Sequence, residues 1–207
     1  MKTWTWTLVS CAVAIAVASV VASLHRTARA DSSSDPQYTS QGNLVRPKDF
    51  QGWIFVGSNL GLGYAQGVAA NTVRELARPS LGEYHNIYLA PEAYAEYAKT
   101  KTFPDKTVLV MDVYRAQTKE PQGIVDQGSF NGLSLGTEVA VKNKNRPDGS
   151  KTDWAYYDFT DRSGGGRFPT DAAAQPDGEC YACHKAHASD DNVWVQFYPV
   201  LRRIKNP

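Results

Sequence analysis

Between residues 53 and 159 the chain alternates short runs of branched and aromatic residues with breaks rich in Gly, Pro, Asn and Asp. Such runs predict β-strands, because branched and aromatic side chains pack well on a pleated surface and the breaks favour turns. Five strands are expected, at Trp53–Gly57, His85–Leu89, Thr107–Tyr114, Thr137–Val141 and Trp154–Phe159. Together they predict a mainly antiparallel β-sheet.

Helical signals are fewer and shorter. The segment Pro91–Lys99 starts with proline at the first helical position and carries acids in its early turn, which predicts a short helix. A second short helix is expected at Asn71–Ala77, and a third near Cys180 within Asp171–Ala188. The expected fold class is therefore α+β, mainly antiparallel β-sheet with a few short helices, in a single domain.

The N-terminus has the pattern of an export signal. Lys2 precedes an apolar stretch from Leu8 to Leu24, and Ala28–Ala30 forms an A-x-A cleavage site. Cys11 lies early in that stretch, so we interpret it as a residue lost on cleavage rather than as a lipid anchor. An uncleaved membrane anchor is the alternative, because the stretch approaches membrane-spanning length. Cleavage after Ala30 and a periplasmic location are the favoured interpretation.

The expected organisation is a signal peptide at residues 1–30, a flexible leader at 31–43 and one domain at 44–207. The leader is rich in Ser, Asp and Gln, a composition that buries little apolar surface. The signal contains three of the 22 basic residues and no acid, so 19 basic residues face 21 acidic ones in the mature chain. This balance argues against nucleic-acid binding. No membrane association is expected after cleavage.

The chain's most specific motif is Cys180-Tyr-Ala-Cys183-His184, a C-x-x-C-H run that is typical of covalent attachment of c-type haem. The two thiols are spaced to form thioethers with the haem vinyl groups, and His184 would be the proximal iron ligand. One covalent haem c per chain is expected. Cys180 and Cys183 are also the only cysteines left in the mature chain, so no thiol remains for a structural disulfide.

Other interpretations of the motif are weaker. A thioredoxin-like C-x-x-C site favours a neighbouring βαβ pattern, which the Ala/Gly/Asp-rich surroundings lack. A structural zinc site needs two more ligands, and only His187 is near.

Two other segments take ordinary interpretations. The run Gly61–Gly67 lacks dinucleotide-loop spacing, so a loop is expected. The basic segment Lys142–Lys151 is expected to be a solvated turn between strands.

Several segments together resemble the cytochrome P-460 and cytochrome c′-beta family. They are Arg46–Gly57, Asn86–Tyr94, Gly136–Lys142, the haem motif and Gln196–Arg202. The resemblance covers most of residues 46–203. It implies a mainly antiparallel β domain with one haem c per subunit, commonly a homodimer, and chemistry on small nitrogen species.

The chain also departs from the family pattern. In the hydroxylamine-oxidising members a lysine within Thr-Val-x-Val-Lys is bonded to the haem edge, and this chain has Met111 at that position. The resemblance places a distal arginine of those enzymes at His85 and their distal glutamate at Glu138. The lysine cross-link is therefore not expected here.

Met111 is the only methionine of the mature chain, and its thioether is a candidate distal axial ligand, because His/Met ligation raises the reduction potential and suits electron transfer. The alternative is a core residue, since Met111 alternates with Leu109 and Val113. His85 is a weaker distal candidate, more typically a structural histidine. Glu138 would by default face solvent, and only the resemblance makes it distal.

Three functions follow. The favoured one is a periplasmic electron carrier with His184/Met111 ligation and soluble or membrane redox partner proteins. The alternatives are a protein that binds nitric oxide or carbon monoxide at an exchangeable position, and an enzyme that oxidises hydroxylamine or nitric oxide with Glu138 as proton carrier. The missing lysine argues against the enzyme.

Overall fold

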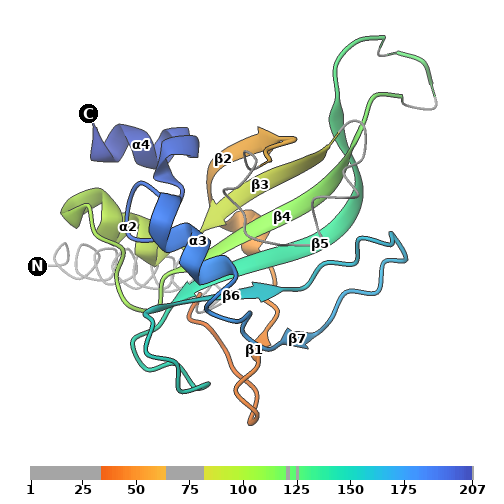
Figure 1. Cartoon of the computed structure of the whole chain (residues 1–207). Helices are drawn as coiled ribbons and strands as arrows, with labels where there is room; N and C mark the ends of the chain where they lie inside the picture. Colours follow the sequence, from red (N-terminus) through yellow and green to blue (C-terminus); the bar gives the residue numbers. More distant parts are fainter. Residues whose placement is uncertain (1–33, 64–81, 120–121, 125, 207) are drawn as a thin grey trace, which may run out of the picture. The chain divides into compact units, whose positions relative to one another are not determined.

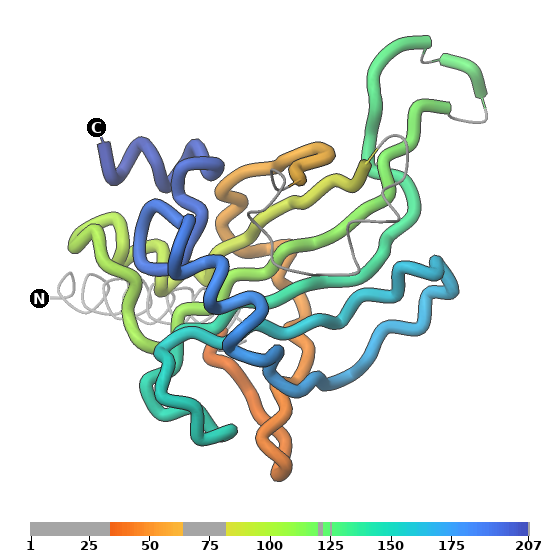
Figure 2. Tube along the Cα trace, viewed as in Figure 1, coloured from red at the N-terminus to blue at the C-terminus, as the bar shows by residue number. Residues whose placement is uncertain are grey.

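The computed structural model describes residues 34–63, 82–119, 122–124 and 126–206. A five-stranded antiparallel sheet dominates this part of the chain, in the order β2-β3-β4-β5-β6 (Figure 1). Its strands are β2 (Ile54–Leu60), β3 (Glu83–Leu89), β4 (Val108–Gln117), β5 (Phe130–Lys142) and β6 (Trp154–Asp158). The predicted α+β class with a mainly antiparallel sheet is confirmed. β4 and β5 pair over most of their length and extend beyond their neighbours (Figure 2).

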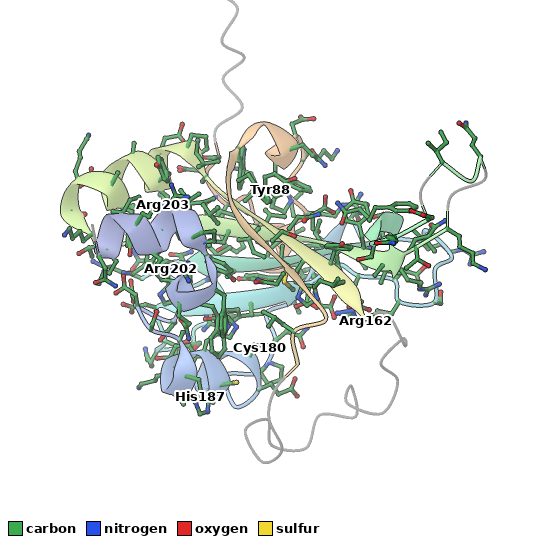
Figure 3. All side chains as sticks on the ribbon, turned by 90° about the horizontal axis from the view of Figure 1, so that it is seen from above. Tyr88, Arg162, Cys180, His187, Arg202 and Arg203 are labelled. Atoms are coloured by element: carbon green, nitrogen blue, oxygen red, sulfur yellow. The ribbon has the colours of Figure 1, made fainter. Side chains whose placement is uncertain are left out.

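Alternation along the strands gives the sheet two different faces. Leu109 and Met111 of β4 point to one face, and Val110 and Asp112 point to the other. Figure 3 views the sheet nearly edge-on, with Cys180 on one side and Tyr88 on the other. The face on the side of Cys180, the first residue of helix α3 (Cys180–His187), is called the α3 face below, and the opposite one the Tyr88 face.

Three α-helices are present in the described part of the chain: α2 (Pro91–Thr100), α3 (Cys180–His187) and α4 (Pro199–Lys205). Two of them lie on the α3 face, α3 against β6 and α4 against β2. Gly57 of β2 allows the close approach of α4, because a Cβ there would lie 2.9 Å from Cδ of Pro199. The short 3-10 helix η3 (Val195–Phe197) connects this pair.

The Tyr88 face is covered by aromatic residues and carries a polar row. The ring of Tyr88 makes edge contacts with Phe55 and with Phe50 of the 3-10 helix η1 (Phe50–Gly52). Asn86, Asp112 and Thr137 are direct cross-strand neighbours on this face and are all buried. A separate two-stranded sheet pairs β1 (Leu44–Val45) with β7 (Asp171–Ala172).

The β5–β6 connection differs from the sequence-based expectation of a solvated turn. That expectation is wrong for Lys142 and Arg146, which are buried at 8% and 7% exposure. Lys142 Nζ donates to the Phe103 carbonyl at 2.9 Å and pairs with Asp191 at 2.7 Å. Arg146 donates to Asp148 and, at 3.0 Å, to Asp177. Both cations are buried because carboxylates from other segments compensate them.

The five predicted strands and the helices near Pro91 and Cys180 are confirmed. The helix expected at 71–77 and the N-terminal segment up to Ser33 lie outside the described residues, as does most of the loop at 61–67. Residues 34–43 contain a turn at Thr39–Gly42, and Tyr38 forms a β-bridge with Leu44. None of the described helices is long and apolar enough to span a membrane.

Candidate functional site

The side chain of His184, on α3, is half-buried and points toward the sheet. Its ring contacts Tyr156 of β6, with ring centroids 4.3 Å apart, and Trp194, at 5.1 Å. Trp194 Nε1 donates a hydrogen bond to His184 Nε2 at 3.0 Å, so Nε2 carries the lone pair and Nδ1 the proton. Burial lowers the pKa of His184 to about 4, which keeps the ring neutral near pH 7. A neutral imidazole with its lone pair on Nε2 is the form that binds iron.

The Nδ1 proton of His184 is directed at a backbone carbonyl. Nδ1 lies 2.8 Å from the oxygen of Asn192, in the tight turn that follows α3. Asp191 and Asn192 both have left-handed backbone angles, with φ of 44° and 63°. This contact fixes the tautomer and the orientation of the imidazole, as is common for metal-binding histidines.

The two cysteines lie on the same helix as His184 and are partly buried. Cys180 is the first residue of α3, and Cys183 follows one turn later. The segment before α3 is fixed by Asp177, whose carboxylate accepts bonds from Arg146 at 3.0 Å and from the Ser150 hydroxyl at 2.6 Å. The β5–β6 connection therefore anchors the start of the helix that carries the motif.

Met111 lies on the α3 face of the sheet. Tyr156, which contacts His184, pairs with Ala140 of β5, and Ala140 pairs with Leu109 of β4. Met111 is two residues beyond Leu109 and therefore shares this face. It is partly exposed and packs against the hydrophobic core. Met111 therefore lies on the sheet face against which the His184 ring packs.

His85 and Glu138 also lie on the α3 face, and a chain of charges connects them. Glu138 Oε1 accepts a bond from Arg162 at 2.6 Å, and Arg162 also donates to Glu83 at 3.2 Å. Glu83 in turn lies 3.7 Å from His85 Nε2. The polar contact with His85 and then the charge of Arg162 lower the pKa of Glu83. These four residues are called the charge network below. Figure 3 shows Arg162 well to one side of Cys180.

The donors of the site suit a haem group. Two thiols one turn apart precede an imidazole whose iron-binding nitrogen carries a lone pair, on a helix that faces a sheet with apolar and thioether side chains. Iron at Nε2 would take the place of the Trp194 hydrogen bond. Among the described residues no cluster of three or more His, Cys, Asp or Glu side chains could hold a separate metal ion.

Sequence reasoning missed Arg162, Glu83, Asn192 and Tyr156. Arg162 follows β6 in a Gly-rich connection, and nothing in the local sequence pattern links it to Glu138. Asn192 acts through its backbone oxygen, which its residue type does not indicate. Tyr156 could have been singled out only by knowing which of two adjacent tyrosines faces α3.

Comparison with known proteins agrees with this site. No curated protein matches the chain. The profile of the family described as Cytochrome P460 matches residues 47–195, well over half of the chain, from the segment before η1 to the first residue of η3. A cytochrome contains haem, and His184 lies inside the matched region. The chain therefore belongs to the cytochrome P460 family and is a haem protein.

Proposed function

We propose that the chain is an exported cytochrome with one covalent haem c, attached through Cys180 and Cys183, with His184 as the proximal iron ligand. The observation that carries this proposal is the state of His184: neutral, half-buried and fixed at Nδ1 by the Asn192 carbonyl. Haem bound there would supply a reversible one-electron centre. The A-x-A site that ends at Ala30 supports export to the periplasm, where disulfides and haem c form.

Acid–acetone extraction of the purified protein tests the covalent attachment. Haem should stay with the wild-type polypeptide and should be extracted from Cys180→Ala/Cys183→Ala. Free extraction from the wild type would refute the proposal. N-terminal sequencing of the protein from a periplasmic fraction should begin at Asp31, and a mature chain that retains the apolar stretch would refute cleavage.

We propose electron transfer as the main function, with Met111 as the second axial ligand. Met111 lies on the face that α3 covers, and a thioether is a soft, neutral ligand that raises the reduction potential. Saturated iron favours electron transfer over ligand binding. Absorption spectra of Met111→Ala and Met111→Leu test this, since leucine keeps the volume and removes the sulfur.

Wild-type ferric protein should show the weak far-red band of sulfur-to-iron ligation. Both Met111 variants should lose that band, have a lower reduction potential and bind carbon monoxide. Val113→Ala, at the next position of the same face, is the matched control and should keep the band. A wild-type protein that is high-spin and binds carbon monoxide at once would refute axial ligation by Met111.

The charge network favours a second candidate function, in which the protein binds nitric oxide or oxidises hydroxylamine or nitric oxide. The Glu138 carboxylate, paired with Arg162, lies in the cross-strand neighbour position to Met111, where it could carry protons to and from a small ligand. Hydroxylamine-dependent reduction of an electron acceptor tests this. Turnover by the wild type that Glu138→Gln abolishes would support it.

We further propose a homodimer and a protein redox partner, on the family resemblance alone. Sedimentation of the holoprotein at several concentrations tests the dimer. A monomer at all concentrations would exclude it.

A further inference from the structure

The Asn192 carbonyl accepts two hydrogen bonds. His184 Nδ1 lies 2.8 Å from the oxygen, and the Tyr156 hydroxyl donates to the same oxygen at 3.1 Å. A carbonyl oxygen has two lone pairs, so both bonds can form together. Each donor withdraws electron density from the oxygen, and each bond is therefore weaker than it would be alone.

Tyr156 is held firmly in this position. It belongs to β6, its side chain is buried, and its ring contacts the His184 imidazole directly. A tyrosine hydroxyl is protonated at neutral pH, so it can donate the hydrogen bond to the Asn192 oxygen. Tyr156 therefore competes permanently with His184 for the same acceptor.

The turn that contains the carbonyl is also fixed. The Asp191 carboxylate accepts bonds from Lys142 Nζ at 2.7 Å and from Trp154 Nε1 at 3.2 Å. The Asp190 carboxylate accepts bonds from the Tyr97 hydroxyl at 2.7 Å and from Lys205 at 2.9 Å. Because the two residues before Asn192 are held in this way, the turn opposes a rotation of the Asn192 oxygen toward one donor and away from the other.

We propose that Tyr156 is a positioning residue that raises the haem reduction potential by weakening the hydrogen bond from His184 Nδ1 to the Asn192 carbonyl. A strong bond at Nδ1 makes the imidazole a better electron donor to iron and stabilises the ferric state. A shared acceptor limits this donation and favours the ferrous state. The inference rests on the proposed ligation of iron by His184 and not on the identity of the second ligand.

Tyr156→Phe tests the proposal, because it removes the competing hydroxyl and keeps the ring against His184. The reduction potential should shift to lower values. The His184 Nδ1 proton in the NMR spectrum of the ferrous protein should shift downfield and exchange more slowly with solvent, as expected for a stronger hydrogen bond. Tyr157→Phe is the matched control, since it removes a buried hydroxyl from the next residue of β6 on the Tyr88 face.

An unchanged potential and Nδ1 resonance in Tyr156→Phe would overturn the proposal, and so would equal shifts in Tyr157→Phe. The same pair of variants in the Met111→Ala background separates this inference from the ligation proposal. If Met111 is a ligand, its removal changes the potential, but the difference that Tyr156→Phe makes should persist. If Tyr156→Phe leaves the potential unchanged in both the wild-type and the Met111→Ala background, with haem still covalently attached, the role of Tyr156 is refuted and the ligation by His184 is not.

Discussion

Replacing the buried Arg146 tests how helix α3, which carries the C-x-x-C-H motif, is anchored. Its guanidinium, with a side chain only 2% exposed, joins Asp148 of its own loop to Asp177, which precedes α3. Removing one partner of a buried ion pair costs about 3–5 kcal/mol. Asp148 and Asp177 are 32% and 39% exposed and regain water, so we expect Arg146→Met to cost the lower figure, about 3 kcal/mol. For a domain of this size that corresponds to a fall in Tm of about 6–12 °C.

The effect is measured by urea and thermal unfolding of the holoprotein, with far-ultraviolet circular dichroism as the signal. The matched control is Lys151→Met, which removes an exposed cation from the same loop and should change the free energy of unfolding by less than about 0.5 kcal/mol. If Arg146→Met unfolds at the same urea concentration as Lys151→Met, the loop does not anchor α3 and the argument from burial is wrong.

Three further predictions concern stability and are measured by urea unfolding. Gly57→Ala should lower the free energy of unfolding by about 1–3 kcal/mol, because its Cβ would overlap the ring of Pro199 at the start of α4. Gly52→Ala, where a Cβ has open space, should change it little. Burial raises the pKa of Asp112, so the stability of the wild type relative to Asp112→Asn should fall as pH rises from about 4; parallel pH profiles of the two proteins would contradict this. Among the described residues Thr137 has the buried hydroxyl without a partner, so Thr137→Val should be neutral or stabilising, whereas Thr107→Val should cost about 1 kcal/mol by losing a 2.7 Å bond.

The sheet could be predicted because its signals are local. Each strand carries its own alternation of branched and aromatic residues, and the Cys180–His184 motif is contiguous in sequence. The position of Met111 on the α3 face followed from the same alternation once one residue of the face was known. Such patterns are set by backbone geometry and need no knowledge of distant segments.

The rest of the site depends on contacts between segments far apart in the chain. Arg162 meets Glu83 and Glu138 only because the connection after β6 returns along the sheet. The basic run at Lys142–Lys151 indicated a solvated surface. Arg146 is buried instead, because Asp177, which lies outside the loop and just before α3, neutralises it. Whether a cation is buried depends on partners from distant segments, which the residues next to it in the sequence do not reveal.

Adjacent residues of β4 serve unrelated environments: Met111 faces α3, and Asp112 lies in the polar row of the opposite face. A point substitution at either position therefore changes one environment and spares the other. Inserting or deleting one residue earlier in the strand would turn the Asp112 carboxylate toward α3 and the Met111 thioether toward the opposite face. Substitution in β4 can therefore change the chemistry of the α3 face alone, whereas a change in the length of that strand disturbs both faces at once.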